Sequence, residues 1–270
     1  MNELAERKVG IAAYLAQEAV KSNVESVVGQ KDAQRFISSV VSAVQTNPEL
    51  AACTNASILS AALLGQSLNL PQSPQIGMFY LVPYENTKKG TKEATFQISY
   101  RGMLQLAMRS GQYKSINVTD IREGELVSYN PVYDAFEFNP ETDFSKRLEL
   151  PVIGYYARFE LVNGYVKELY WPKERMEKHA ITYSKSYRKD LDKKTKYSFW
   201  SMNYEDMAKK TMLRQLISKW GIMSVEMERG YILDQAVVRE DGSPDYIDNT
   251  PDDPEKGTDI FEEGSNDNGE

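Results

Sequence analysis

The chain has 270 residues, of which 41% are apolar and 26% charged, a composition that is ordinary for a soluble globular protein. It contains no apolar run of about 18 residues, and its N-terminus lacks the apolar segment of a signal peptide, so we expect a cytoplasmic protein without a membrane span. One cysteine, Cys53, and one histidine, His179, exclude an internal disulfide and a His/Cys zinc site and disfavour a Cys/His catalytic pair. The sequence GxxxxGKS or GxxxxGKT does not occur, which argues against a P-loop and nucleotide hydrolysis.

The net charge of −7 is concentrated at the C-terminal end. Residues 239–270 contain 12 acidic and 2 basic residues, so the rest of the chain carries a balance of +3. This end is also rich in Gly, Pro and Asn and offers little apolar surface to bury, which predicts a disordered acidic tail over residues 237–270. The tail favours solubility; alternatively it competes with nucleic acid for a basic groove, or docks a partner through Ile260 and Phe261.

The first 70 residues are predicted to be helical. Residues 4–28 are rich in alanine, glutamate and lysine, and apolar residues recur at helical spacing over residues 31–45. Asn55 is placed to cap a third helix over residues 55–68. These helices pack either on a sheet or on a neighbouring subunit, and the sequence does not separate the two options.

Residues 71–236 are predicted to form one α+β core, an antiparallel sheet of hairpins packed with helices. Alternation of apolar and polar residues indicates strands, and the turn Asn163-Gly164 is a strong hairpin signal. The expected strands are residues 77–84, 94–99, 115–122, 125–129, 136–138, 152–161 and 165–171, and a helix is expected over residues 172–181.

The stretch 93–114 passes from a half-buried strand to a helix that Gly111 ends. Arg101, Gln105 and Arg109 are four residues apart and lie on one stripe of that helix, while Met103 and Leu106 can face a core. No Asp or Glu occurs from residue 94 to residue 119. This stripe suits an anionic ligand, or it is simply a solvated helix face.

A second basic region runs from residue 167 to residue 219, with 14 Lys or Arg against 7 Asp or Glu. Within it, residues 183–200 mix cations with aromatic side chains and are predicted to be a loop, a composition that suits single-stranded nucleic acid but also an ordinary solvated surface. A long helix then begins after Asn203 and ends at Trp220; Lys210 and Arg214 share a stripe, with Lys209 beside it. Two basic stripes favour a shared groove over two unrelated surfaces.

Four sequence blocks in this order resemble the RecT family of phage and prophage single-strand annealing recombinases. They are SYRGMLQLAMRSGQ from Ser99, REGE from Arg122, WPKERME from Trp171, and WxxxYEDMAKKTxLRxL from Trp200. The resemblance spans roughly residues 70–236. It implies a Rad52-like core that coats single-stranded DNA and anneals it to its complement without ATP, leading to an annealed duplex intermediate in a homo-oligomeric ring or helical filament.

The resemblance also implies partners and a site. A partner exonuclease and a host single-strand binding protein are expected, with no required cofactor and Mg²⁺ only as a modulator of pairing. The DNA groove would be lined by the Tyr100-Arg101 turn, Arg109 and the helix carrying Lys209, Lys210 and Arg214. We expect Gln97, Tyr100 and Gln105 to position the backbone or bases, and Lys114 completes the set.

Two other functions remain open from the residues alone. A metal-dependent nuclease needs clustered carboxylates; Asp120, Glu123, Glu160 and Glu168 fall on or near predicted strands, but none of their spacings is diagnostic. A passive coating protein would bind single strands without annealing them. Only the family resemblance favours annealing over coating.

Overall fold

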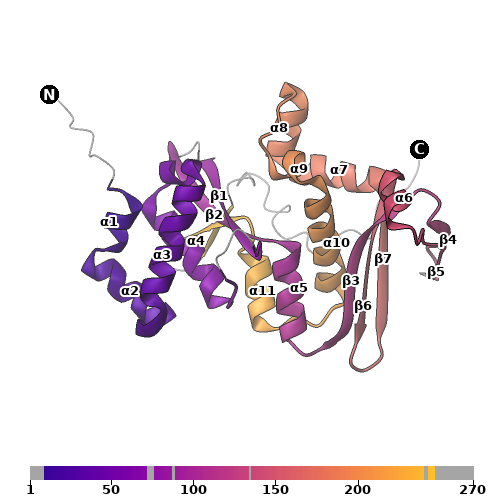
Figure 1. Cartoon of the computed structure of the whole chain (residues 1–270), viewed down its shortest axis with the longest axis horizontal. Coiled ribbons are helices and arrows are strands. Elements are labelled where there is room, and N and C mark those ends of the chain that lie inside the picture. Colours follow the sequence, from indigo (N-terminus) through magenta and orange to yellow (C-terminus); the bar gives the residue numbers. More distant parts are fainter. Residues whose placement is uncertain (1–8, 72–75, 87–88, 134, 240–242, 247–270) are drawn as a thin grey trace, which may run out of the picture. The chain divides into compact units, whose positions relative to one another are not determined.

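The computed structural model describes residues 9–71, 76–86, 89–133, 135–239 and 243–246 (Figure 1). The chain divides into two compact units. The first is the chain up to Gly102 together with the segment that begins at Glu228, and the second is Met103–Met227. The expected boundaries at 70/71 and 236/237 differ from this division, because the first β-hairpin packs with the N-terminal helices.

The N-terminal part of the first unit is helical, as predicted. Its elements are α1 (Ile11–Leu15), α2 (Glu18–Val28), α3 (Gln30–Thr46), the 3-10 helix η1 (Pro48–Ala52) and α4 (Asn55–Ser67). The prediction that Asn55 caps α4 is wrong. Thr54 is the N-cap, and its hydroxyl oxygen accepts from the Ser57 amide at 3.4 Å, whereas the Asn55 side chain donates to the Val9 carbonyl at 2.7 Å. The only cysteine of the sequence, Cys53, is buried beside this cap.

Strands β1 (Phe79–Asn86) and β2 (Thr91–Ile98) form the predicted antiparallel hairpin, with Phe79 opposite Ile98. The prediction that β2 is half-buried is wrong, because its residues from Glu93 to Ile98 are all buried. The reason is that β2 contacts both α4 and β8 (Ala236–Val238), which shield it from water.

The turn from β2 into α5 (Tyr100–Arg109) requires glycine at the third residue of the helix, Gly102. A Cβ atom on Gly102 would lie 2.2 Å from the Met78 carbonyl oxygen and 2.7 Å from Cγ1 of Ile98. The Ser99 hydroxyl accepts from the Gly102 amide at 3.1 Å and so satisfies one of the free donors at the helix start. Backbone packing therefore fixes where α5 begins.

The first unit ends in a short hairpin of β8 with β9 (Pro244–Tyr246), which follows α11 (Val225–Ile232). The buried carboxylate of Asp234 accepts from the Ile98 amide at 3.0 Å, and the Gln235 amide donates to the Phe96 carbonyl at 2.8 Å. The predicted disordered tail therefore starts too early, since Val237 and its neighbours bury apolar surface. Residues 247–270 of that predicted tail lie outside the described residues.

The second unit is built on a sheet of β3 (Tyr113–Arg122), β6 (Val152–Leu161) and β7 (Val166–Pro172), paired antiparallel in the order β3-β6-β7. Helix α10 (Tyr204–Trp220) packs across all three strands, and α7 (Lys173–Tyr183) packs on β6 and β7 (Figure 1). Tyr155, Phe159 and Met212 fill the space between sheet and helix and are fully buried. The predicted Asn-Gly hairpin is confirmed between β6 and β7, where Gly164 has a φ of +87°.

A small hairpin of β4 (Leu126–Asn130) and β5 (Ala135–Phe138) extends from β3, followed by α6 (Phe144–Glu149), which the sequence pattern did not predict. The Asp143 carboxylate caps α6 by accepting from the Ser145 and Lys146 amides.

The prediction of a loop over residues 183–200 is wrong, because this segment contains α8 (Lys185–Lys193) and α9 (Phe199–Met202). Ser184 and Ser198 are the N-caps of these helices. The buried carboxylate of Asp190 accepts from the hydroxyls of Thr195 and Ser201 and from the amides of Tyr197 and Ser198, at 2.6 to 2.9 Å. One buried acid therefore organises a strongly polar segment.

The α+β class with antiparallel pairing is confirmed across the described residues. Within those residues, no helix combines the length and the apolar character that crossing a membrane requires.

Candidate nucleic-acid interface

Helix α5 presents its predicted polar stripe to solvent. Arg101, Gln105 and Arg109 are exposed, whereas Met103, Leu106 and Ala107 on the opposite side are buried. The Arg101 guanidinium lies 5.9 Å from the centroid of the Tyr100 ring, and its Nε donates to the Tyr100 hydroxyl at 3.4 Å. The helix therefore carries two arginines that are accessible to a ligand, one of them held against a tyrosine.

No acidic residue lies near the stripe in the sequence, but one from another helix lies near it in the folded chain. Glu226, from the first turn of α11, lies close enough for Arg109 to help lower the pKa of its carboxyl. The larger causes of that lowering are the carboxyl's hydrogen bonds to its own amide and to Ser224. Sequence analysis missed Glu226 because nothing in its local pattern links it to α5.

The three predicted DNA-binding cations of helix α10 differ in their exposure to solvent. Lys210 is only 5% exposed, because residues on both sides of it, such as Met207 and Leu213, are buried. Lys209 is partly exposed and lies 3.9 Å from the Asp120 carboxylate, and Arg214 is partly exposed one turn after Lys210. In this structure a ligand in solvent can contact Lys209 and Arg214, whereas Lys210 lies inside the unit.

Gln97 is also enclosed. It is 3% exposed, and its amide donates to the Tyr84 hydroxyl across the β1–β2 hairpin at 3.1 Å. Tyr100, by contrast, is partly exposed at the start of α5. Of the two residues predicted to position DNA from this turn, Tyr100 is thus the accessible one.

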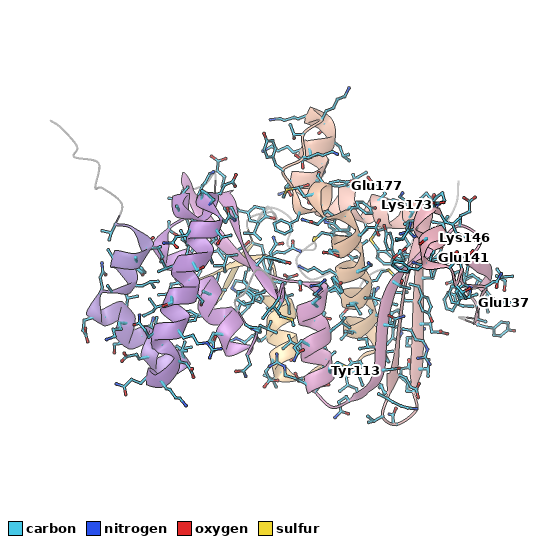
Figure 2. The ribbon with its side chains drawn as sticks, in the orientation of Figure 1. Tyr113, Glu137, Glu141, Lys146, Lys173 and Glu177 are labelled. Atoms are coloured by element: carbon cyan, nitrogen blue, oxygen red, sulfur yellow. The ribbon has the colours of Figure 1, made fainter. Side chains whose placement is uncertain are left out.

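Lys114 lies at the opposite end of β3 from Lys209. Beside Lys114, Tyr113 donates its hydroxyl to the Ile222 carbonyl just beyond α10, at 2.9 Å (Figure 2 labels Tyr113). Lys209, near the start of α10, reaches Asp120. Since a strand rises about 3.3 Å per residue, residues 114 and 120 are roughly 20 Å apart. Lys114 is exposed and paired with Glu160 at 2.5 Å, so the structure does not bring it together with Lys209.

Two carboxylates at the REGE block, Glu125 and the nuclease candidate Asp120, are held by arginines. Asp120 accepts from Nε of Arg122 at 2.6 Å and lies 3.4 Å from Arg147, while Glu125 accepts from Nε of Arg147 at 2.6 Å. Burial alone would raise the pKa of both carboxyls, but the arginine hydrogen bonds and charges outweigh it and lower both pKa values. Among the described residues, no group of three His, Cys, Asp or Glu is arranged to hold a metal ion. The REGE block is therefore a structural junction between β3, β4 and α6.

Comparison with known proteins gives the family. The sequence model of the RecT family matches residues 34–254. A Bacillus subtilis (strain 168) protein named "Uncharacterized protein YqaK" is 39% identical over 236 residues, which cover 87% of this chain and 74% of that protein. "Protein RecT" of Escherichia coli (strain K12) is 29% identical over 232 residues, covering 83% of this chain and 80% of that protein.

The chain therefore belongs to the RecT family, and its α+β architecture agrees with that assignment. The match begins at residue 34, so it includes most of α3 and all of α4, beyond the blocks on which the resemblance rests. Membership supports a role in single-strand annealing recombination in general terms.

Proposed function

We propose that this protein binds single-stranded DNA and anneals it to a complementary strand without ATP, as a step in homologous recombination. The observation that carries the proposal is membership of the RecT family over residues 34–254. The exposed arginine stripe of α5 supports it, because phosphate contacts bind every sequence alike.

Annealing needs binding without catalysis. A strand held by its phosphates keeps its base edges free to pair, and extensive aromatic stacking would oppose this. Each chain offers few exposed cations of the predicted set, so affinity must come from several subunits on one strand. We therefore propose a homo-oligomer, as a ring or a helical filament. ATP is not required, and Mg²⁺ modulates pairing only.

The accessible members of the predicted set have distinct roles. Arg101, Arg109 and Arg214 bind phosphates, and Tyr100 and Gln105 position the backbone or bases. The remaining members, Gln97, Lys114, Lys209 and Lys210, lie in buried or ion-paired surroundings and act through the elements they hold or as secondary contacts. A partner exonuclease would supply the single strands, and a host single-strand binding protein would share them.

The test adds two labelled complementary oligonucleotides to the purified protein one after the other, without ATP, and follows pairing by fluorescence transfer. The products are sized on a deproteinised gel. We expect faster pairing of intact strands. Binding with suppressed pairing would show a coating protein instead, and shortened strands that EDTA protects would show a nuclease.

The site assignment has its own test. Arg101→Gln with Arg109→Gln should weaken binding to all sequences alike and reduce the slope of log K against log salt by about 1.4, since each lost single-strand phosphate contact removes about 0.7. Lys31→Gln with Arg35→Gln is the matched control, because these exposed cations also lie on one stripe of a single helix, α3. Equal slopes for the two double variants would contradict the assignment.

A further inference from the structure

Helix α8 carries cations that the α5 and α10 set does not include. Lys185, Arg188, Lys189 and Lys193 recur at three- and four-residue spacing, and all four are exposed. Asp192 is the one acid on this face. Lys194 and Lys196, just beyond the helix, are exposed too. Within the described part of the chain, none of these six cations forms an ion pair.

The opposite face of α8 holds the helix in place. Tyr187 is buried and donates its hydroxyl to Glu177 of α7 at 2.8 Å, and Asp190 is buried in the network that orders the chain up to α9. Burial also raises the pKa of Tyr187 to about 12, with the Glu177 carboxylate adding to the effect, so the hydroxyl remains a donor at neutral pH. The cationic face is thus presented by a helix whose position is fixed from behind.

An exposed ring stands at the end of this face. Tyr197 is 80% exposed, yet its backbone amide donates to the buried Asp190 carboxylate at 2.9 Å. An aromatic side chain that is open to solvent on an anchored backbone, next to Lys196, can stack on an unpaired base at little ordering cost. A surface that served only solubility would not need an exposed aromatic ring at this position.

The dimensions suit a strand of nucleic acid. At 1.5 Å per residue, Lys185 and Lys193 are about 12 Å apart along α8, a length that exceeds the spacing of neighbouring phosphates, so the face can contact more than one phosphate of a strand. Figure 1 shows α8 beyond α9 at the end of α10, away from the strands of the β3–β6–β7 sheet.

We propose that the outer face of α8, with Tyr197, is a second binding surface for single-stranded DNA, distinct from the α5 stripe. It binds phosphates through Lys185, Arg188, Lys189 and Lys193, and it stacks one base on Tyr197. This surface deepens the proposed function and rests on it.

The experiment measures binding of a fluorescent mixed-sequence oligonucleotide by anisotropy at several salt concentrations. Lys185→Gln with Lys189→Gln should reduce the salt slope by about 1.4, while the matched pair Lys31→Gln with Arg35→Gln should leave it unchanged. Each double variant removes two exposed positive charges from one helix, so an effect of net charge alone would be the same in both variants. Circular dichroism verifies that the α8 variant is folded.

Tyr197→Ala should weaken binding about tenfold at every salt concentration without changing the slope, and Tyr197→Phe should retain wild-type affinity, because stacking needs only the ring. A salt slope for the α8 pair equal to that of the α3 pair overturns the proposal, even if Tyr197→Ala binds weakly. Failure of the wild-type protein to bind or pair strands would instead refute the proposed function, so the two failures are distinguishable.

Discussion

Arg109 and Glu226 form the electrostatic interaction that bears most directly on the α5 stripe. The carboxylate comes from a different helix and lies in the field of the arginine that we assign to a phosphate. Both side chains are exposed, so water and salt screen their attraction. Under the proposed assignment, a phosphate has to compete with Glu226 for Arg109, and the acid therefore limits the affinity of the stripe.

Glu226→Gln should consequently increase affinity for single-stranded DNA. We expect a gain of roughly twofold to fivefold at low salt, the range of a screened surface pair, that disappears at high salt. Anisotropy titrations at two salt concentrations measure it. Glu228→Gln, two residues along α11 and also exposed, is the control for loss of one negative charge. Equal gains in both variants would show that net charge alone is responsible.

Burial separates residues that look alike in the sequence. Lys209 and Lys210 are neighbours, and Gln97 and Gln105 both belong to the stretch 93–114, yet Lys210 and Gln97 are enclosed while Gln105 is open to solvent. The α5 stripe was predictable because one helical face is enough to define it. The faces of α10 and β2 were not, because they depend on the strands and helices that cover them from elsewhere in the chain.

At the scale of the elements, the junction of β3, β4 and α6 depends on Arg147. Its guanidinium holds Glu125 through two nitrogens, at 2.6 and 3.0 Å, and donates to the Asp120 carbonyl at 2.7 Å. Removing it leaves a nearly fully buried carboxylate with backbone amides, those of Arg122 at 2.7 Å and of Glu141, in place of a neutralising charge. Loss of one partner from a buried charge pair is far more costly than loss of an exposed pair.

Arg147→Gln should therefore destabilise the protein by about 3 kcal/mol. Lys146→Gln, on the same helix, removes an exposed lysine whose ion pair with Asp143 is 3.7 Å long, and should cost less than about 1 kcal/mol (Figure 2 labels Lys146). Urea unfolding followed by circular dichroism compares the two. Similar losses in both variants would show that the junction contributes little.

The same junction predicts a pH dependence. The fold lowers the pKa values of Asp120 and Glu125 from 3.8 and 4.5, so the unfolded chain binds more protons than the folded one just below those values. The stabilisation is complete above about pH 4.5 and is lost as the pH falls through the lowered pKa values. Unfolding between pH 6 and pH 3 should show a smaller acid-induced loss in Arg147→Gln than in wild type.

Local signals decided which elements were predictable. The β6–β7 hairpin follows from Asn163-Gly164, and the helices α3 and α10 follow from long periodic patterns. Helix α8 was missed because its burial depends on Tyr187 and Asp190, and an aspartate that anchors a fold through hydrogen bonds looks like a surface residue in the sequence. Helix α6 is only six residues long and is held by its own Arg147, which bonds to Glu125, a residue far from it in the sequence.

At the scale of the whole molecule, charge is divided along the sequence. Residues 247–270 contain nine acidic residues and one basic residue, a balance of −8 against −7 for the entire chain. The remainder, with a balance of +1, includes all the cations assigned to DNA. An acidic segment covalently attached to a cationic binding surface repels DNA at long range or competes with it.

Truncation after Tyr246 should therefore raise affinity for single-stranded DNA at low salt, with the difference vanishing near 0.5 M salt as screening becomes complete. Anisotropy titrations across that range measure the effect. A full-length chain whose nine C-terminal acids are replaced by Asn or Gln is the control for length and should match the truncation. Unchanged low-salt affinity in both variants would leave the segment as a solubilising end.

The burial of Cys53 has a practical consequence. A thiol enclosed beside the α4 cap is shielded from maleimide reagents, so the native protein contains no readily labelled thiol. A cysteine introduced at Gln105 on α5 or at Arg188 on α8 would then be the only reactive thiol, and one environment-sensitive dye could be attached there without removing any native residue from the core. Each of the two proposed DNA surfaces can thus carry its own fluorescent reporter, and stopped-flow mixing would measure when each one binds a strand.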